Sequence, residues 1–287
     1  MQDTNNKNEV NNKVLTGERA LFNVSNLIVN ECTFEDGESP LKESSFLKIY
    51  KSSFNWKYPL WYCHDVEVSD SRLSETGRAG IWYTDKLKMV DTIIEAPKAF
   101  RRCKGLKLEN VSFTNASETM WKCTDIMMNS VDVKGDYFAM NSSNIVADNL
   151  TIDGNYPFDG AKNVEIRNSK LISKDAFWNA ENITVYDSFI SGEYLGWNSK
   201  NVTFINCTIE SLQGLCYIDG LVMKNCKTVN TNLAFEYSTC DVELTSHVDS
   251  IKNPSGGSIR ALSVGELIME EDKVNVDATK IIIGNEN

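Results

Sequence analysis

The chain has 287 residues, of which 41% are hydrophobic, so it is long enough to bury a sizeable core. Its 40 Asp and Glu against 29 Lys and Arg give a formal charge of −11, which excludes a general attraction to nucleic acid or to anionic membranes. No apolar run approaches the roughly 20 residues that span a bilayer, and the polar start MQDTNNKNEVNNKV lacks the apolar core of a signal peptide, so we expect a cytoplasmic protein.

A unit of about 19 residues repeats along the chain. In GAKNVEIRNSKLIS, NAENITVYDSFISG and NSKNVTFINCTIES, an Asn precedes an apolar–x–apolar pair, and a second Asn or Asp follows the pair. The first apolar residues of the units are Leu27, Leu47, Val66, Leu87, Leu106, Ile126, Ile145, Val164, Ile183, Val202, Leu221 and Val242. Self-similarity at this period predicts a solenoid.

Within each unit the apolar residues alternate with period two, which predicts strands rather than helices. The two Asn and Asp columns mark sharp bends, because these residues tolerate left-handed backbone angles. We therefore predict an all-β, right-handed parallel β-helix of about twelve coils with three short strands in each. The alternative solenoid, a leucine-rich repeat, fits less well because most units start with Ile or Val and their return segments have no helical period.

The ends of the chain depart from the repeat. We predict that residues 1–24 cap the first rung, that residues 25–245 form the β-helix, and that residues 246–287 form a carboxy-terminal cap, all within one domain. The turn cluster NPSGGS and the alternating stretch SIRALSVGELIMEED mark this last region. An oligomerisation arm is the alternative for residues 246–287.

Six of the eight cysteines fall in two columns of small residues that we expect to point inward: Cys32, Cys207 and Cys226 in one column, and Cys63, Cys103 and Cys123 in the other. Buried thiols pack as small hydrophobic groups, so the prediction is free cysteines. Two pairs lie on adjacent rungs, Cys103 with Cys123 and Cys207 with Cys226, at a spacing that also permits disulfides.

Five of the six tryptophans fall in one column of the repeat, together with Arg101. The column before it is apolar and is expected to face the core, so the tryptophan column faces outward or marks a corner. Flat rings stack on sugars, and neighbouring cations suit anionic groups. The predicted ligand-binding residues are Trp61, Tyr62, Trp82, Tyr83, Arg101, Arg102, Trp121 and Lys122. The alternatives are that these rings simply pack under loops or form a protein interface.

The stretch EDGESPLKES at 35–44 concentrates polar side chains at the start of the repeat. The cluster comprises Asp36, Glu38, Lys42 and Glu43. It predicts either a salt-bridged first rung or a small polar or metal-binding pocket beside Trp61. With only two histidines and no convergent carboxylates, the sequence predicts no metal centre and no cofactor, and it leaves catalysis open.

Four stretches carry a family resemblance: GERALF at 17–22, FEDGESPLKES at 34–44, KYPLWY at 57–62 and IKNPSGGSIRA at 251–261. Together with the repeat they resemble a family of uncharacterised bacterial proteins, over roughly residues 17–270. The resemblance implies a single right-handed β-helix domain of the pectate-lyase-like fold group. It implies no mechanism, and the Gly-His-Gly, paired-Asp and Arg-x-Pro-x-x-Arg signatures of that group's enzymes are absent here.

The resulting functional hypothesis is carbohydrate binding or processing through the aromatic and basic face of the early coils. Trp61, Trp82 and Trp121 would stack on sugar rings, while the Arg and Lys residues would hold anionic groups. The expected partner is a polysaccharide or anionic glycan, with no nucleic acid or membrane partner. The alternatives are a non-catalytic scaffold that binds a protein or itself as a homo-oligomer, and a metal-assisted enzyme at the first-coil loop.

Overall fold

The computed structural model describes residues 8–284, and the chain divides into two compact units, Met1–Phe138 and Ala139–Asn287. Each unit is a right-handed parallel β-helix in which successive coils of about 19 residues pair in register. This confirms the predicted fold class. No helix among the described residues is long and apolar enough to cross a membrane.

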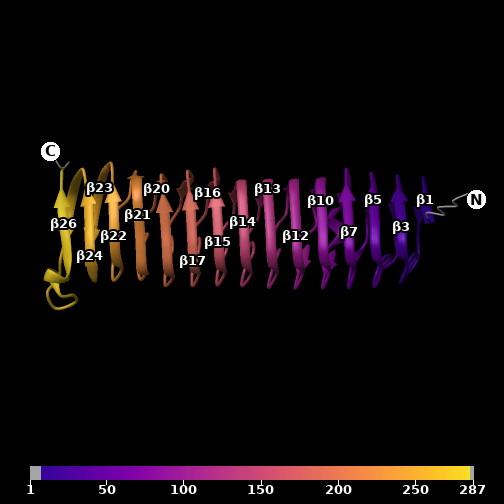
Figure 1. The fold of residues 1–287 in the computed structure, drawn as a ribbon, viewed down its shortest axis with the longest axis horizontal. Helices are drawn as coiled ribbons and strands as arrows, with labels where there is room; N and C mark the ends of the chain where they lie inside the picture. Colours follow the sequence, from indigo (N-terminus) through magenta and orange to yellow (C-terminus); the bar gives the residue numbers. More distant parts are fainter. Residues whose placement is uncertain (1–7, 285–287) are drawn as a thin grey trace, which may run out of the picture. The chain divides into compact units, whose positions relative to one another are not determined.

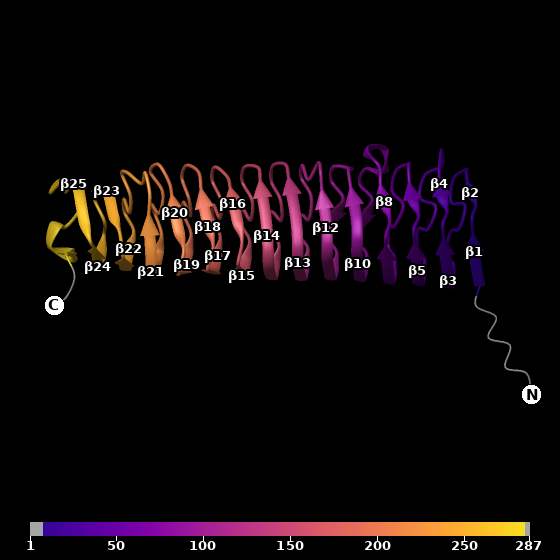
Figure 2. The same ribbon diagram turned by 90° about the horizontal axis from the view of Figure 1, so that it is seen from above.

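The first unit consists of seven coils. Its main strands lie side by side in chain order in Figures 1 and 2. The elements are β1 (Asn8–Asn11), β2 (Val14–Leu15), β3 (Ser25–Asn30), β4 (Thr33–Phe34), β5 (Ser45–Tyr50), β6 (Ser53–Phe54), β7 (His64–Ser69), β8 (Arg72–Leu73), η1 (Glu75–Gly77), β9 (Ile81–Trp82), β10 (Asp85–Ile94), β11 (Phe100–Arg101), β12 (Lys104–Phe113) and β13 (Thr124–Lys134).

The second unit consists of eight coils built in the same way. Its elements are β14 (Ser143–Asp153), β15 (Lys162–Arg167), β16 (Lys170–Ile172), β17 (Glu181–Tyr186), β18 (Phe189–Ser191), β19 (Lys200–Ile205), β20 (Thr208–Glu210), β21 (Asp219–Thr228), β22 (Thr239–Leu244), β23 (His247–Lys252), β24 (Gly256–Ala261), β25 (Ser263–Ile268), η2 (Val276–Ala278) and β26 (Thr279–Ile283).

The first apolar residue of each repeat points into the core, as its periodicity predicts. Leu27 pairs with Leu47, and Leu47 pairs with Val66, so like residues stack on neighbouring rungs. Leu47 and Val66 are each only 1% exposed. Parallel strands lie about 4.8 Å apart, so each coil buries its apolar face against the coil on either side.

The Asn and Asp columns turn the backbone, as predicted. Asn163, Asn182 and Asn201 have φ values of 55°, 59° and 52°, in the left-handed region. The side-chain amide of Asn182 donates to Oδ1 of Asn163 at 3.0 Å, and that of Asn201 donates to Oδ1 of Asn182 at 2.9 Å. These bonds join the bends of neighbouring coils, so the column both bends the chain and links the rungs.

The third side of the coil differs from the prediction of three strands per coil. Strands form there in the pair β9–β11 and, in the second unit, in the pair β23–β25. Elsewhere turns stack through backbone bonds, such as the one from the Leu60 amide to the Gly80 carbonyl at 2.9 Å. Turns suffice because bulky residues such as Tyr62 and Phe177 sit at positive φ and redirect the chain.

The structure has about fifteen coils rather than the predicted twelve, and the extra ones lie at the ends. Strands β1 and β2 pair in parallel with β3 and β4, and β24 and β26 continue the ladder after β22. The residue in register with Leu221 is Cys240, not the predicted start Val242, which pairs with Met223. Cys240 and then Gly257 occupy the position of the first apolar residue in these two coils, so the hydropathy pattern of the repeat is lost there.

All eight cysteines are buried and free, which confirms the predicted free thiols. Cys63, Cys103 and Cys123 share an inward column with hydroxyl residues such as Thr84, and the Cys63 and Cys103 thiols make the same contact as the Thr84 hydroxyl. The Thr84 hydroxyl donates to the Leu60 carbonyl at 2.6 Å, and the Cys63 thiol donates to the Leu41 carbonyl at 3.1 Å. A small donor in this column therefore bonds to the backbone of the preceding coil.

Burial raises the pKa of the Cys63, Cys216 and Cys240 thiols to about 12, from the usual 9.0. The unfolded chain therefore releases these protons at lower pH than the folded protein does. The part of the free energy of unfolding that comes from keeping these thiols protonated is lost as pH rises from about 9 to 12. Each thiol contributes a slope of up to about 1.4 kcal/mol per pH unit. Denaturant titrations across this range should show a shallower pH dependence for Cys240→Ala than for the native chain; identical slopes would contradict the assignment.

Candidate functional site

Four of the predicted ligand-binding residues form one continuous stack in the first unit. The Trp61 and Trp82 rings lie 5.0 Å apart at 7°, and the Arg101 guanidinium carbon lies 4.6 Å from the Trp82 ring and 4.8 Å from the Trp121 ring. Tyr58 covers the other end of the stack, with its ring 4.6 Å from that of Trp61. Arg101 thus takes the place of a ring between two indoles.

Backbone contacts fix the orientation of the three indoles. The N–H groups of Trp61, Trp82 and Trp121 donate to the carbonyls of Ala79, Lys98 and Tyr137 at 2.6, 2.9 and 2.7 Å. The preceding apolar column is buried, with Leu60, Ile81, Phe100 and Met120 all 0% exposed. The tryptophans are half-buried, so this side of the coil has the predicted phase, with indoles outside and aliphatic residues inside.

A second stack runs beside the first. The Tyr62 and Tyr83 rings lie 4.8 Å apart at 2°, with the Lys42 ammonium 5.6 Å from Tyr62 and the Arg102 guanidinium 5.8 Å from Tyr83. A cation therefore closes each end of the tyrosine pair, an arrangement that is attractive to the ring faces. Lys122 follows Trp121 and occupies the next rung of this column.

The stacking decides what these residues offer to a ligand. A sugar binds an aromatic ring on its flat face, but neighbouring rungs cover the faces of Trp61, Trp82, Tyr62 and Tyr83. Tyr62, Arg102 and Lys122 remain exposed, whereas Nε and Nη2 of Arg101 are buried and its guanidinium lies 3.6 Å from the Glu118 carboxylate. The structure thus brings the eight predicted residues together, in an arrangement that favours a stabilising ladder over a stacking platform.

The first-coil cluster is part of the ladder as well. Asp36 and Glu38 accept backbone bonds from Gly17 and Arg19 at 2.9 Å each, so the segment is a regular rung. Glu38 pairs with Lys57 at 3.2 Å, and Lys42 pairs with Glu43 at 3.5 Å. Within residues 8–284 no group of three His, Cys, Asp or Glu side chains could hold a metal, so the geometry supports a salt-bridged rung and offers no metal pocket.

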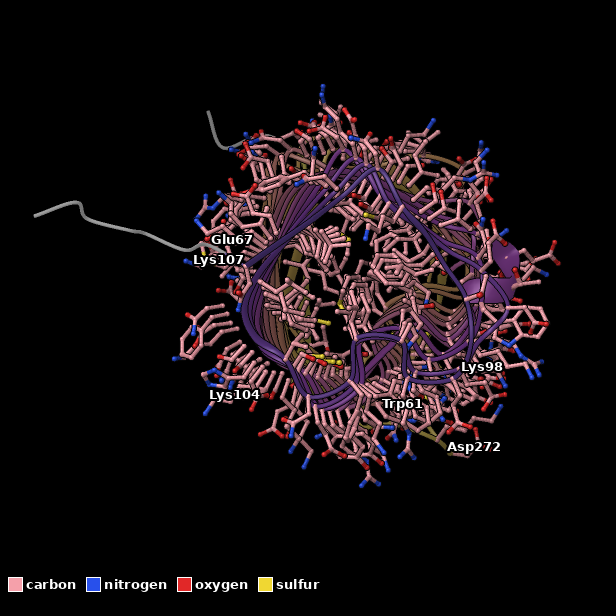
Figure 3. All side chains as sticks on the ribbon, turned by 90° about the vertical axis from the view of Figure 1, so that its right-hand side faces the viewer. Trp61, Glu67, Lys98, Lys104, Lys107 and Asp272 are labelled. Atoms are coloured by element: carbon pink, nitrogen blue, oxygen red, sulfur yellow. The ribbon has the colours of Figure 1, made fainter. Side chains whose placement is uncertain are left out.

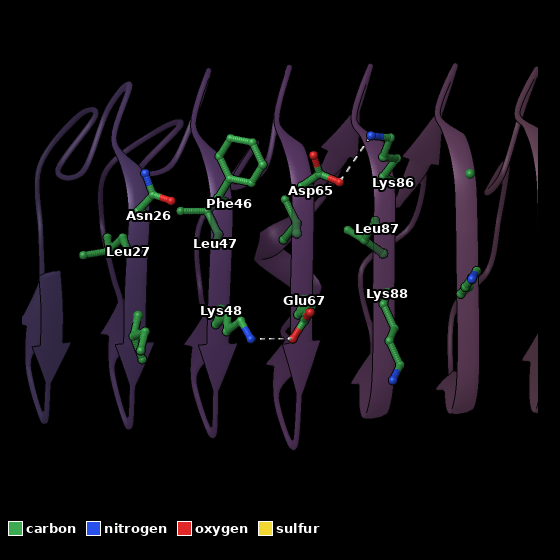
Figure 4. Close-up of a pocket in the computed structure, with 14 residues that line it drawn as sticks. Asn26, Leu27, Phe46, Leu47, Lys48, Asp65, Glu67, Lys86, Leu87 and Lys88 are labelled. Carbon is green, nitrogen blue, oxygen red and sulfur yellow. Dashed lines mark ion pairs between the residues drawn. The ribbon is translucent and has the colours of Figure 1, made fainter. Parts of the chain in front are cut away.

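An open groove of about 750 Å³ lies on another side of the same coils and is shown in Figure 4. It crosses β3, β5, β7, β10 and β12 at right angles, so it is about 19 Å long at the usual strand spacing. Its walls are the outward residues before and after each buried start residue. The wall residues are Asn26, Ile28, Phe46, Lys48, Asp65, Glu67, Lys86, Lys88, Gly105 and Lys107.

Phe46 is the unusual residue of this groove. It has φ 54°, in a column that elsewhere holds mainly Asn, Asp or Gly, and its side chain is 54% exposed. Positive φ is costly for a bulky residue, and exposure of a large ring adds to the cost. The ring meets the His64 ring edge-on at 6.4 Å, and His64 Nδ1 lies 2.6 Å from Oδ2 of Asp65. An exposed ring in a column that elsewhere holds mainly Asn, Asp or Gly is a candidate ligand contact.

The charges of the groove are unevenly partnered. Lys48 pairs with Glu67 and Lys86 pairs with Asp65, each at 3.6 Å, as the dashed lines in Figure 4 mark. Farther along, Lys88 and Lys107 are in register on neighbouring strands, and no carboxylate of residues 8–284 lies within 4.0 Å of either ammonium. One end of the groove is therefore apolar and the other end carries free positive charge.

Lys104 connects this basic end to the predicted cations. Figure 3 views the coils end-on and shows Lys107 on one side, Trp61 on the next, and Lys104 between them. The sequence reasoning missed the groove residues. Two signals were available: Phe46 and Lys86 interrupt a bend column of Asn, Asp and Gly, and the run KAFRRCKGLK at 98–107 holds five cations and no acid.

Several solved structures resemble this chain at low identity. The surface adhesin PfbA of Streptococcus pneumoniae aligns with a TM-score of 0.48 and 9% identity, over 85% of this chain and 82% of the other. The A-module of the mannuronan C-5 epimerase AlgE4 of Azotobacter vinelandii aligns at 0.33 and 10%, over 97% and 89%. An exopolygalacturonase of Thermotoga maritima aligns at 0.33 and 11%, over 97% and 84%. Likenesses this distant carry no argument about what the chain binds.

No curated protein matches the sequence. One family model does, the protein of unknown function DUF3737, and it spans residues 8–282, nearly the whole described chain. The matched region contains the repeat, both aromatic stacks and the groove. The chain therefore belongs to the DUF3737 family.

Proposed function

We propose that this protein binds an acidic polysaccharide in the groove of its first unit. The observation that carries the proposal is the pair Lys88 and Lys107, which lie in register on β10 and β12. Glu67, the residue in register with Lys88 on β7, pairs with Lys48 at 3.6 Å, and no carboxylate of residues 8–284 lies within 4.0 Å of the Lys88 or Lys107 ammonium. Like charges directly opposite each other on neighbouring strands destabilise a sheet. An anionic group laid across the two ammonium groups removes that repulsion and gains charge-assisted hydrogen bonds.

The distribution of charge supports an anionic ligand at this place. The first unit has 18 Lys and Arg against 20 Asp and Glu, so it carries −2 of the total formal charge of −11. The second unit carries −9 and repels a polyanion over its length. The basic end of the groove is thus a local exception in an acidic protein.

The apolar end of the groove suits a sugar ring. Phe46 offers an exposed aromatic surface beside Ile28, and the aliphatic face of a pyranose packs against such a ring. Asn26, Asp65 and Glu67 supply hydrogen-bonding groups for hydroxyls along the same walls. A chain of sugars with carboxylate or sulfate groups matches both ends of the groove at once.

The length of the groove favours a linear polymer over a small molecule. Five coils contribute one wall residue each to either side, so a chain lying along the axis can contact every rung in turn, from the apolar end to the basic end. Lys104 lies around the corner from Lys107 in Figure 3, and the exposed Arg102 and Lys122, which share the next column, extend the basic surface for a longer anionic chain. In this proposal the predicted cations keep their role, and Phe46 replaces the indoles as the stacking ring.

Charge reversal at the lysine pair tests the proposal. We expect Lys88→Glu/Lys107→Glu to weaken binding to a polyuronate or a sulfated glycan by about 100-fold or more, because each charge-assisted contact contributes about 1.5–3 kcal/mol. Titration calorimetry with size-defined oligosaccharides measures this. Neutral oligosaccharides and a single-stranded oligonucleotide serve as comparison ligands, and both should bind far more weakly than the acidic glycan.

The matched control reverses two exposed lysines outside the groove, Lys134→Glu/Lys170→Glu, with the same change in net charge. It should bind the acidic glycan like the native chain, apart from a small uniform electrostatic loss. Equal losses in both double variants would show that net charge alone acts and would overturn the site. Failure of the native chain to bind any acidic glycan would overturn the function itself.

A further inference from the structure

One wall of the groove in the first unit is interrupted by a glycine. The wall consists of five residues at the same bend position of successive coils, and all of them have positive φ, from 52° to 72°. They are Asn26, Phe46, Asp65, Lys86 and Gly105. Gly105 therefore makes the same bend as the other four residues but adds no side chain to the wall.

The backbone does not require a glycine at this position. A Cβ added to Gly105 would approach Lys86 no closer than 3.6 Å, which is ordinary contact. Asp125, the next residue of the same column, adopts φ 58° with a full side chain, as Asn and Asp readily do. Lys86 leaves the space clear, because its ammonium lies 3.6 Å from Asp65 on the side away from Gly105 (Figure 4). Gly105 is thus an opening in the wall.

This opening lies within a run of cations on one coil. Arg102, Lys104 and Lys107 are exposed, whereas the cysteine and the leucine between them are at most 1% exposed. No carboxylate of residues 8–284 lies within 4.0 Å of any of these three cations. Lys107 lines the groove, and Figure 3 shows Lys104 around the corner from it. One basic band therefore leads out of the groove, over Gly105, to the next side of the coil.

The neighbouring coils do not offer such a band. On the preceding coil, Asp85 is in register with Lys104. On the following coil, the groove would continue between Asp125 and the exposed, apolar Met127. An anionic chain that continued straight ahead would meet a carboxylate and no cation at these two positions, and like charges repel. The charges therefore favour a change of direction at the opening.

We propose that Gly105 is the exit of the groove, through which an acidic glycan longer than the groove continues onto Arg102 and Lys122. This inference rests on the proposed binding of an acidic polysaccharide in the groove. The chain lies against Lys107, crosses the backbone at Gly105 and turns toward Lys104. The rotatable bonds of a glycosidic linkage permit such a turn between neighbouring sugars. Arg102 and Lys122 occupy adjacent rungs beyond the corner, so they add contacts that only a longer chain reaches.

Titration calorimetry with two size-defined acidic oligosaccharides tests the exit, one no longer than the groove and one with twice as many sugars. The native chain should bind the longer one more tightly by about 10-fold or more, the effect of one further charge-assisted hydrogen bond. Gly105→Asn fills the opening with a residue type usual in this column and should bring the ratio of the two affinities close to one. A variant that keeps the native ratio overturns the inference.

The native chain alone separates this inference from the function on which it rests. Equal affinity for the two lengths would overturn the exit and leave binding in the groove intact. Failure to bind either oligosaccharide would overturn the proposed function and the exit together.

Gly220→Asn is the matched control, because Gly220 occupies the same bend position in the second unit with φ 79°. It should keep the native ratio of affinities, and an equal loss of the ratio in both glycine variants would overturn the exit. Arg102→Gln/Lys122→Gln leaves the bend untouched and should also bring the ratio close to one. Combined with Gly105→Asn it should lower the ratio no further, since both changes remove the same contacts. Circular dichroism shows whether each variant is folded.

Discussion

Replacing Trp82 with alanine is expected to lower the free energy of unfolding by about 3 kcal/mol, near the lower end for large aromatic truncations because this indole is half-buried. The ring faces of Trp82 contact Trp61 and the Arg101 guanidinium, and its N–H donates to the Lys98 carbonyl. Alanine opens the stack in the middle and leaves Trp61 and Arg101 each with a bare face. Urea titration measures the loss.

The same variant separates structural support from ligand binding. If the ladder holds coils together and the groove binds the glycan, Trp82→Ala loses stability but retains affinity for the acidic glycan. Trp56→Ala is the matched control, because Trp56 is also half-buried but lies outside the stacks; it should cost less stability. If Trp82→Ala kept its stability but lost affinity for the glycan, the binding site would be the indole column and not the groove.

Phe113→Ala is expected to have the largest effect on stability, about 3–5 kcal/mol. Phe113 is 1% exposed, and its ring meets those of Phe100 and Phe138 edge-on at 5.9 and 5.8 Å. The cavity left by the ring cannot collapse, because backbone bonds on both sides hold the coils at strand spacing. Equilibrium denaturation measures the loss, and Phe113→Leu, which keeps most of the volume, should lose far less.

The loss should also be local. Coils of a solenoid contact only their neighbours, so a defect weakens the coils around it before distant ones. Hydrogen exchange in Phe113→Ala should therefore accelerate in the first unit and stay near native values in coils such as β19 of the second. Uniform acceleration along the whole chain would show that the protein unfolds as one cooperative block and would contradict this expectation.

The fold could be predicted because several independent columns of the repeat each indicate a feature of the coil at the same period. Leu47, Val66 and Leu87 give the inward position, and Asn182 and Asn201 give the bend, at one period. The prediction stopped short at the ends because the position of the first apolar residue is held by Asn8 in the first coil and by Gly257 near the last, and neither residue is apolar. Pairing in the folded chain, not hydropathy, defines those coils.

The candidate site was predicted less well, for a reason of geometry. The column that gathers Trp61 and Trp82 was correct, but the strand spacing of about 4.8 Å puts such rings face to face. The rings of an aromatic column therefore cover each other's faces. An exposed ring face is expected instead where an aromatic residue has no aromatic residue at the same position in the neighbouring coils. Phe46 is such a residue, and its presence in a column of Asn, Asp and Gly indicates the groove.

The groove's dependence on one pair of wall residues per coil has a consequence for how such a protein can change. Inserting or deleting a whole 19-residue coil would shift the groove's length by one strand spacing, about 4.8 Å, while every remaining coil keeps equivalent neighbours. The number of coils would then set the length of glycan that the groove holds. Tandem duplication of coils would change that length in fixed steps, without changing the side chains that determine which sugar is bound.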